Sequence, residues 1–369
     1  MIIGIDGNEA NVKNRVGVGQ FAYHIISWLH RIDTINKYIV YLKEPPLSDM
    51  PPMSLRWEYR VFGPSQMWTK VALPFNLYTQ KEKLDVFYSP SHYSPQFSPF
   101  PTIPTIHDLG YLKFKNQFAR KDLYQLINWT KASIKKAKHI ITVSEFSKSE
   151  LQKIYKIPEN KITVAYNGVG EPPQIPEDSS QRILSKFNVK DPYFLYLGTL
   201  KPNKNIPFLI NAYSKFIKTN VNKNIKLVIA GKKGWLFIDI FSSVKKLGVE
   251  KNVIFTDFIS ETEKWALYQN ALAFVIPSTY EGFGIPALEA MKVGTPVIAS
   301  SIPPLKEVVE NAGILIDPSN EDNLAQQLSL ISDNKLSSKY SELGKKQAQK
   351  FTWEQSATKI LNTFQSLAN

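Results

Sequence analysis

The amino-acid sequence predicts an α/β protein made of two halves, each with its own parallel sheet. Short apolar, β-branched runs recur along the chain, helix-like stretches separate them, and a polar, proline-rich segment at residues 171–180 interrupts the series once. Strands that alternate with helices are typical of parallel sheets, because a parallel connection has to cross the sheet. With 369 residues the chain is long enough for two domains. We therefore expect one α/β domain over residues 1–172 and a second over residues 181–352, joined by a linker.

Each expected strand is a short apolar run bounded by polar or turn-forming residues. In the first half these runs lie at residues 2–5, 38–42, 86–88, 103–106, 140–143 and 162–165. In the second half they lie at residues 194–197, 226–230, 253–255, 271–276, 296–299 and 313–316. The stretches 19–30, 121–137 and 208–218 are helix-like in pattern. Ligands of open α/β sheets bind beyond the carboxyl ends of the strands, so we looked for functional residues directly after each run.

The composition excludes several protein classes. The chain has no cysteine, which rules out disulfides, thiolate zinc sites and a cysteine nucleophile. The apolar run at residues 271–277 is far shorter than the ~20 residues of a membrane-spanning helix. The first residues have the pattern of a strand and not of a signal peptide. We expect a cytoplasmic protein.

The charge is strongly basic and unevenly distributed. The formal net charge is +13, of which residues 1–170 carry +9 and residues 171–369 carry +4. Residues 111–140 alone hold eight lysines or arginines against one aspartate. Such an excess favours anionic partners, namely nucleic acid, acidic lipid surfaces or phosphorylated small molecules. No groove-reading motif accompanies the charge, so we do not expect a nucleic-acid partner.

The strongest motif follows the expected strand that ends near Ile276. Pro286 suits the first turn of a helix, so the backbone N–H groups of Phe283, Gly284 and Ile285 would point out of a helix N-terminus, which is a site for a phosphate. The carboxylates of Glu281 and Glu289 bracket this site and could accept hydrogen bonds from sugar or ribose hydroxyls. The alternative is a surface charge at Glu281 and a favourable first-turn acid at Glu289.

A second motif runs from Gly198 through Thr199 and Lys201 to Lys204. A strand enters a turn at Gly198, and a lysine-containing loop then leads into a helix. Lysine is a compact charge suited to a diphosphate. The alternative is two solvated lysines at a turn.

Two weaker signals lie in the first half. Gly17 and Gly19 form a glycine loop that opens a helix and could approach a phosphate closely. The spacing from Asp6 is too long for the tight turn of a dinucleotide fold. His107 ends an expected strand, where its imidazole could donate to or polarise a sugar hydroxyl. The alternatives are an ordinary helix-start loop and a structural histidine bonded to a turn.

Other chemistries lack their motifs. The sequence has no Gly-x-Ser-x-Gly elbow, no His-Glu-x-x-His and no Walker A lysine loop. It also has no Asp-x-Asp pair to hold Mg²⁺ on a sugar diphosphate. We therefore expect neither a metal nor a further cofactor.

Taken together, these stretches resemble the retaining glycosyltransferases of family four. That family has the GT-B fold, two Rossmann-like domains with parallel sheets facing across a cleft. The matching pieces, in family order, are Gly17-Val18-Gly19, Ser89-Pro90, His107-Asp108, residues 143–147, residues 166–169, residues 198–205, residues 231–235, the Glu281/Glu289 pair and residues 294–297. The stretch before His107 and residues 231–235 look most like bacterial mannosyltransferases that build surface polysaccharide. The resemblance implies that a C-terminal helix, about residues 353–369, crosses back onto the first domain.

The resemblance also implies roles for single residues. Glu281 would contact the donor sugar, Glu289 the ribose, and Lys204 the diphosphate. The backbone of residues 283–285 would hold phosphate and sugar, Gly19 would lie beside the distal phosphate, and His107 near a far sugar hydroxyl. The nucleobase would lie against Gly231 and the segment around Phe258. The family usually has an arginine in the loop of Lys204, whereas Thr199 and Asn203 occupy the candidate positions here.

The expected reaction moves a hexose from a nucleotide diphosphate sugar to an acceptor with retention and without metal. GDP-mannose is the first expectation for the donor, and UDP-glucose or a UDP-hexosamine the second. A non-catalytic nucleotide-sugar-binding paralogue and a sugar-nucleotide epimerase are the alternatives. The basic first half suits a glycan or lipid-linked acceptor at an anionic inner membrane face. The expected contacts are Lys113, Lys115, Arg120, Lys121, Lys131, Lys135, Lys136 and Lys138, aided by Trp68 and Trp129.

Overall fold

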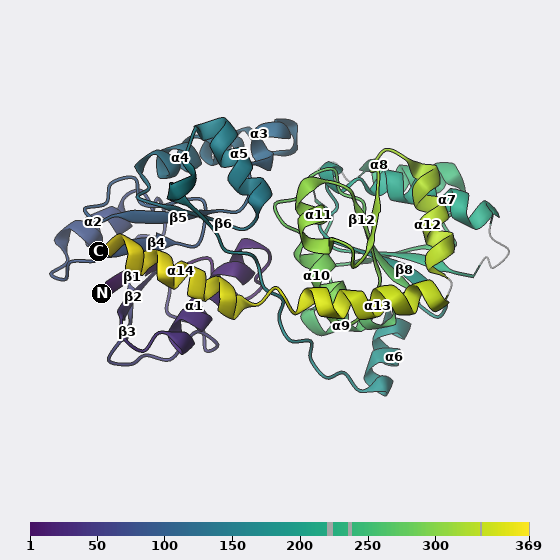
Figure 1. Ribbon diagram of the computed structural model, residues 1–369, viewed down its shortest axis with the longest axis horizontal. Coiled ribbons are helices and arrows are strands. Elements are labelled where there is room, and N and C mark those ends of the chain that lie inside the picture. The colour runs from purple at the N-terminus through teal and green to yellow at the C-terminus, as the bar shows by residue number, and fades with distance from the viewer. Residues whose placement is uncertain (220–223, 235–237, 333, 369) are drawn as a thin grey trace. The chain divides into compact units, whose positions relative to one another are not determined.

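The computed structural model describes residues 1–219, 224–234, 238–332 and 334–368, and it divides into two α/β units (Figure 1). Unit 1 comprises Met1–Gly168 together with Thr352–Asn369, and unit 2 comprises Val169–Phe351. Each unit has one twisted sheet with helices on its faces. Among the described helices, none combines the length and the apolar character needed to cross a membrane.

The sheet of unit 1 is parallel and has the strand order β3-β2-β1-β4-β5-β6-β7. Its strands are β1 (Ile2–Asp6), β2 (Lys37–Leu42), β3 (Trp57–Val61), β4 (Val86–Ser89), β5 (Thr102–Ile106), β6 (Ile140–Thr142) and β7 (Ile162–Val164). The strand order reverses direction between β1 and β4. In this fold type, that reversal opens a crevice at the carboxyl ends of the strands.

The helices of unit 1 include one that the chain supplies after unit 2. They are α1 (Val18–Ile32), α2 (Ala72–Thr79), α3 (Gly110–Lys113), α4 (Arg120–Lys136), α5 (Glu145–Tyr155) and α14 (Trp353–Ala368), with 3₁₀ turns at Lys115–Gln117 and Glu159–Lys161. α14, yellow in Figure 1, packs along α1. At its start the Trp353 ring stacks on His24 with 4.7 Å between ring centroids. The amphipathic face of α14 is thereby buried in unit 1.

Unit 2 has a six-stranded parallel sheet in the order β10-β9-β8-β11-β12-β13. Its strands are β8 (Tyr193–Leu197), β9 (Lys226–Ala230), β10 (Val253–Asp257), β11 (Ala273–Ile276), β12 (Val297–Ser300) and β13 (Ile314–Ile316). Here the order reverses between β8 and β11. The loops that follow these two strands are the loops that carry Lys204 and Glu281.

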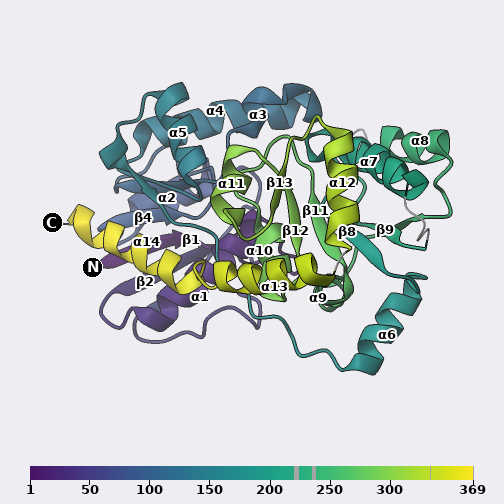
Figure 2. The ribbon, with the colours of Figure 1, turned by 45° about the vertical axis from the view of Figure 1, so that its right-hand side comes forward.

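The helices of unit 2 cover both faces of its sheet. They are α6 (Glu177–Lys186), α7 (Ile206–Thr219), α8 (Ile238–Leu247), α9 (Glu261–Asn270), α10 (Ile285–Lys292), α11 (Pro303–Val309), α12 (Glu321–Ile331) and α13 (Asn334–Ala348), with a 3₁₀ turn at Pro202–Lys204. α7 packs against α12, and α10 against α13 (Figure 2). A large apolar cluster between α7, α12 and the sheet forms the core of this layer.

The structure differs from the expected elements in two places. β3 was missed because Trp57–Val61 carries two charged residues, Glu58 and Arg60, which suit an edge strand but weaken the apolar pattern. The second half of the polar segment at 171–180 is helical, because α6 begins at Glu177 after Pro176. Glu177 and Asp178 lie in the first turn of α6, where a negative charge interacts favourably with the positive end of the helix dipole. These two acidic residues therefore stabilise the start of a helix and do not mark a loop.

Candidate functional site

Glu281 lies in the loop between β11 and α10, and its carboxylate is bonded to a residue of that loop and to one of the loop after β8. Its Oε1 accepts hydrogen bonds from Lys204 Nζ at 2.6 Å and from Ser278 Oγ at 2.6 Å. The side chains of Glu281 and Lys204 are 13% and 23% exposed. Glu281 is therefore a largely buried, paired carboxylate and not a solvated surface charge.

The loop that carries Lys204 is held against the Glu281 loop by backbone contacts. The 3₁₀ turn at Pro202–Lys204 ends at Asn205, which is in the left-handed region with φ 55°. Asn203 accepts a backbone hydrogen bond from Thr279 and donates its side-chain amide to the carbonyl of Tyr280. Asn203 occupies one of the positions considered for the absent arginine, and its role here is to join the two loops.

Glu289 lies in the second turn of α10 and forms a second lysine–carboxylate pair. Its Oε1 accepts from Lys264 Nζ at 2.5 Å, and its Oε2 accepts from the Tyr268 hydroxyl at 3.2 Å. Burial raises the pKa of the Glu289 carboxyl, while the Lys264 ammonium opposes that rise. Lys264 and Tyr268 stand four residues apart on α9, so they lie on one face of that helix.

Sequence reasoning did not find Lys264 or Tyr268. α9 begins with a capping box in which Ser260 and Glu263 satisfy each other's backbone N–H groups. That start fixes the helix phase and directs residues 264 and 268 toward α10. The capping box is a local pattern that can be recognised in the sequence, whereas the packing of α9 against α10 cannot be predicted from it.

The N-terminus of α10 is built on a glycine. Gly284 has φ +123°, and a Cβ there would lie 2.6 Å from Leu305 Cδ2. The helix begins at Ile285, Pro286 has no N–H, and Ala287 N donates to the Gly284 carbonyl at 3.0 Å. The Phe283 side chain is 3% exposed and packs edge-on against Phe351. Phe283 can therefore face a ligand through its backbone only.

The turn after β9 joins the two segments assigned to the nucleobase. Gly231 N donates to the carbonyl of Asp257 at 3.0 Å, and a Cβ at Gly231 would lie 2.0 Å from the carbonyl oxygen of Gly198. The Phe258 ring is half exposed, with Lys232 Nζ 4.4 Å from its centroid. Thr199 is exposed next to Gly198. Trp235, which the family resemblance included, lies outside the described residues.

His107 lies in unit 1, directly after β5, and its tautomer follows from its contacts. Nε2 is 3.1 Å from the carbonyl oxygen of Pro90, which only accepts, so Nε2 carries the proton. Burial and the neighbouring His92 lower the pKa of His107 to about 3. The ring is therefore neutral at pH 7, and its Nδ1 accepts. Because the His107 N–H serves the Pro90 carbonyl here, Nδ1 is the ring atom left to meet a sugar hydroxyl, as an acceptor, and the sugar contact itself stays a prediction.

His92 is a partner of His107 that the sequence did not reveal. The two rings stack with 5.6 Å between centroids, and His92 Nε2 accepts from the backbone N–H of His107. Burial lowers the pKa of His92 to about 4. Phe21 of α1 packs edge-on against His107 at 4.9 Å. These contacts fix the imidazole plane of His107.

The glycine loop of unit 1 precedes α1. Gly17 is the N-cap of α1 with φ 46°, and a Cβ there would meet no atom within 4 Å. A Cβ at Gly19 would lie 3.0 Å from the carbonyl oxygen of Glu9. Open space beside Gly17 is consistent with close approach by a ligand, while Gly19 is required by packing against the chain itself.

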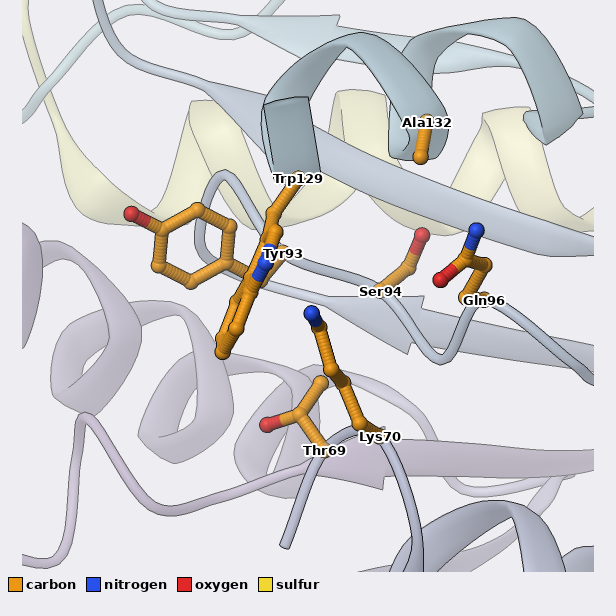
Figure 3. A pocket seen from close by; sticks show the side chains of 7 residues that line it. All are labelled: Thr69, Lys70, Tyr93, Ser94, Gln96, Trp129 and Ala132. Atoms are coloured by element: carbon orange, nitrogen blue, oxygen red, sulfur yellow. The ribbon is translucent and has the colours of Figure 1, made fainter. Parts of the chain in front are cut away.

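A shallow hollow of about 250 Å³ lies on unit 1, beside α4 (Figure 3). Lys70 Nζ lies 3.8 Å from the centroid of the Trp129 ring, and Tyr93 packs edge-on against that ring. The other residues that line the hollow are Thr69, Ser94, Gln96 and Ala132. The hollow combines an aromatic wall with a cation and several hydrogen-bonding groups.

Comparison with known proteins gives a consistent picture over both units. The family described as "Glycosyltransferase Family 4" matches residues 17–170, and that described as "Glycosyl transferases group 1" matches residues 178–356. The O-antigen chain mannosyltransferase B of Escherichia coli is 29% identical over 76% of this chain and 74% of its own length. The O-antigen chain mannosyltransferase RfbU of Salmonella typhimurium is 32% identical over 59% of this chain and 57% of its own length. The chain thus spans between about half and three quarters of these two relatives.

Solved structures share the fold over almost the whole chain. A sucrose-phosphate synthase from Thermosynechococcus elongatus has a TM-score of 0.76 at 19% identity, covering 99% of this chain and 98% of its own. HepE of Anabaena, solved with UDP and glucose, has a TM-score of 0.74 at 17% identity, covering 99% of each chain. The two parallel sheets thus form the GT-B fold that the sequence predicted. With two glycosyltransferase families matched in order along its units, the chain belongs to the family 4 glycosyltransferases.

Proposed function

We propose that this glycosyltransferase moves mannose from GDP-mannose to a glycan or lipid-linked acceptor, with retention of anomeric configuration and without a metal ion. The observation that carries the proposal is the pairing of Lys204 with Glu281 beside the N-terminus of α10. A cation, a carboxylate and the positive end of a helix suit a sugar diphosphate better than any other common ligand. The names of the two O-antigen relatives favour mannose.

In the proposed reaction the bond between the anomeric carbon and the diphosphate oxygen breaks. The acceptor oxygen bonds to the same face of that carbon, and the acceptor proton passes to the departing diphosphate. The negative charge that develops on the diphosphate is stabilised by Lys204 and by the N–H groups at the start of α10. Glu281 accepts from hydroxyls of the sugar, and Glu289 accepts from the ribose. This distribution of positive charge removes the need for Mg²⁺.

Calorimetric titration with GDP, UDP and ADP, and then with their sugars, in the presence of EDTA tests the proposal. We expect GDP and GDP-mannose to bind without metal, and Glu289→Ala to weaken both. Tight binding of UDP with no binding of GDP would move the donor to a UDP-sugar. Binding of GDP-mannose without transfer to any glycan acceptor would support a non-catalytic paralogue, and failure of every nucleotide to bind would refute the proposal.

We further propose that α4 and its flanks bring unit 1 to an anionic membrane surface. All eight cations named from the sequence are exposed. The aromatic part of the expectation needs correction: Trp68 is 1% exposed, lies in an apolar cluster and donates to the carbonyl of Phe62, so it cannot reach a lipid. Tyr124 and Phe97, which are 66% and 58% exposed, supply aromatic surface instead.

Vesicle co-sedimentation tests the membrane surface. The variant Lys121→Gln/Lys131→Gln/Lys135→Gln removes three charges from α4. As a matched control, Lys345→Gln/Lys346→Gln/Lys350→Gln removes three charges from unit 2, two on α13 and one just after its end. We expect binding to anionic vesicles that falls with added salt, is lost in the α4 variant and persists in the control. Equal binding to neutral and anionic vesicles would show that the surface has another use.

A further inference from the structure

The ability of Glu289 to accept hydrogen bonds from a ribose depends on whether its carboxyl group is ionised. A ribose offers two hydroxyl donors, and an ionised carboxylate accepts from both, whereas a protonated carboxyl must use one oxygen as a donor. The side chain of Glu289, on α10, is 13% exposed and meets Lys264 and Tyr268 of α9. Burial of this kind favours the neutral form. Some group therefore has to keep Glu289 ionised at neutral pH.

Lys264 is the group placed to do so. Its Nζ is 2.5 Å from Glu289 Oε1 and 2.6 Å from Glu261 Oε1, and its side chain is only 14% exposed. Burial alone would lower the pKa of Lys264, but the two carboxylates raise it, so the lysine is held as a cation. The charged or titratable groups that face Glu289 are Lys264, Glu261 and Tyr268 of α9, and Tyr196 of β8 faces Tyr268. Lys264 is the cation among those four.

We propose that Lys264 is a positioning residue that holds Glu289 as a fixed, ionised acceptor for the ribose of the nucleotide. The proposal rests on the nucleotide-sugar function given above and extends it to a residue outside the Glu281/Glu289 motif. Lys264 Nζ donates to Oε1 of Glu289, and the Tyr268 hydroxyl donates to Oε2. These two hydrogen bonds fix the plane of the carboxylate before a ligand binds. Each oxygen of the carboxylate keeps a further lone pair for a ribose hydroxyl.

The two lysines at the site differ in accessibility. Lys204 is bound through one carboxylate oxygen and is 23% exposed, so a diphosphate can draw it away from Glu281. Lys264 bridges two carboxylates, and its ammonium lies 4.9 Å from the centroid of the Trp265 ring. Lys264 therefore stays in place when the donor binds, while Lys204 changes partner.

The test is the pH dependence of nucleotide affinity, measured by calorimetry with the nucleoside diphosphate that the wild type binds. In Lys264→Met the buried Glu289 loses its counter-ion, so we expect the pKa of its carboxyl to rise further and its neutral form to gain. We expect affinity at least about tenfold below wild type at pH 7, the loss expected for a charged hydrogen bond, and recovery as pH rises toward 9. Lys264→Arg keeps the charge and should stay close to wild type with a flat profile.

Two further variants separate this role from a structural one. Lys186→Met removes a lysine that pairs with Glu263 of the same helix α9, and we expect no change in affinity or pH profile. Lys264→Met/Glu289→Gln leaves no unpaired buried charge and guards against unfolding of the single variant. We expect its affinity to be low and independent of pH. A flat, wild-type profile in Lys264→Met would overturn the proposal.

Infrared difference spectra distinguish failure of this inference from failure of the proposed function. The protonated carboxyl band of Glu289 should appear in Lys264→Met at neutral pH and be absent from wild type; it is identified as the band of Lys264→Met that is lost in Lys264→Met/Glu289→Gln. If wild type binds no nucleotide but the band behaves in this way, the proposed function fails while the control of Glu289 by Lys264 stands. If nucleotide binds and the band is absent from Lys264→Met, the inference fails alone.

Discussion

Replacing Gly231 by alanine should damage unit 2 far more than replacing other glycines does. Gly231 has φ +142°, a conformation that L-residues rarely adopt, and its amide N–H is engaged with Asp257. The added Cβ would lie 2.0 Å from the carbonyl oxygen of Gly198, about 1 Å inside the closest approach that real Cβ atoms show. That oxygen belongs to backbone fixed by the hydrogen bond from Gly198 N to Ala230. It cannot swing aside as the end of a side chain can.

The magnitude follows from two contributions. Backbone strain costs roughly 1–2 kcal/mol, and overpacking against a fixed atom costs roughly 1–3 kcal/mol. The free energy of unfolding of Gly231→Ala should therefore fall by roughly 2–5 kcal/mol. Two other glycines separate the contributions, because a Cβ at either would meet no atom within 4 Å. Gly248 has φ +67°, so Gly248→Ala should lose about 1 kcal/mol through strain alone.

The second control is Gly170, which lacks a positive φ in the strained range. Gly170→Ala should change stability by less than about 0.5 kcal/mol. Urea unfolding of the three variants, followed by fluorescence and circular dichroism, measures the series. Nucleotide titration should show a loss for Gly231→Ala alone, since the turn is part of the site. A loss of stability in Gly231→Ala no larger than in Gly248→Ala would refute the steric argument.

Three further outcomes are expected. Lys204→Met should weaken nucleoside diphosphate binding by roughly tenfold or more while leaving nucleoside binding unchanged, because a charged hydrogen bond to phosphate is lost; equal loss for both ligands in calorimetry would contradict this role. Ser144→Ala removes the N-cap of α5 and should cost about 1 kcal/mol in urea unfolding, more than Ser149→Ala in the same helix. The pKa values of His92 and His107 are lowered in the folded state to about 4 and about 3, so the stability that they provide is present above pH 6.5 and is lost as pH falls toward those values. The free energy of unfolding, measured in urea from pH 7 to pH 4, should fall less steeply with pH in His107→Gln, because about one proton fewer is taken up on unfolding. An unchanged slope would show that the ring is not buried and neutral.

Much of the site could be predicted because its signals are local. The Glu281/Glu289 spacing, the glycine before α10 and the lysine after β8 all lie in the segments that directly follow β11 and β8. The pairing of Lys204 with Glu281 joins residues that are 77 apart in sequence. It depends on β8 lying next to β11, an order that follows from the sheet and not from any local pattern.

The residues that sequence reasoning missed owe their roles to packing between elements. Lys264 has the appearance of an ordinary helix lysine until α9 is packed against α10. Trp68 was expected on a membrane surface, yet it is buried with Leu73 and Leu77 of α2. The tautomer of His107 could not be predicted because the carbonyl of Pro90, which fixes it, is 17 residues away.

The helix α14 also bears on how the chain matures during synthesis. Residues that complete the hydrophobic face of α1 emerge from the ribosome only after all of unit 2 has been made. Until then, the apolar residues of α1 that α14 covers are exposed in the nascent chain. Unit 2 is continuous in sequence and can fold without waiting. We therefore expect unit 1, whose synthesis begins first, to complete its fold after unit 2. Before that, the exposed apolar face of α1 is where a chaperone would bind.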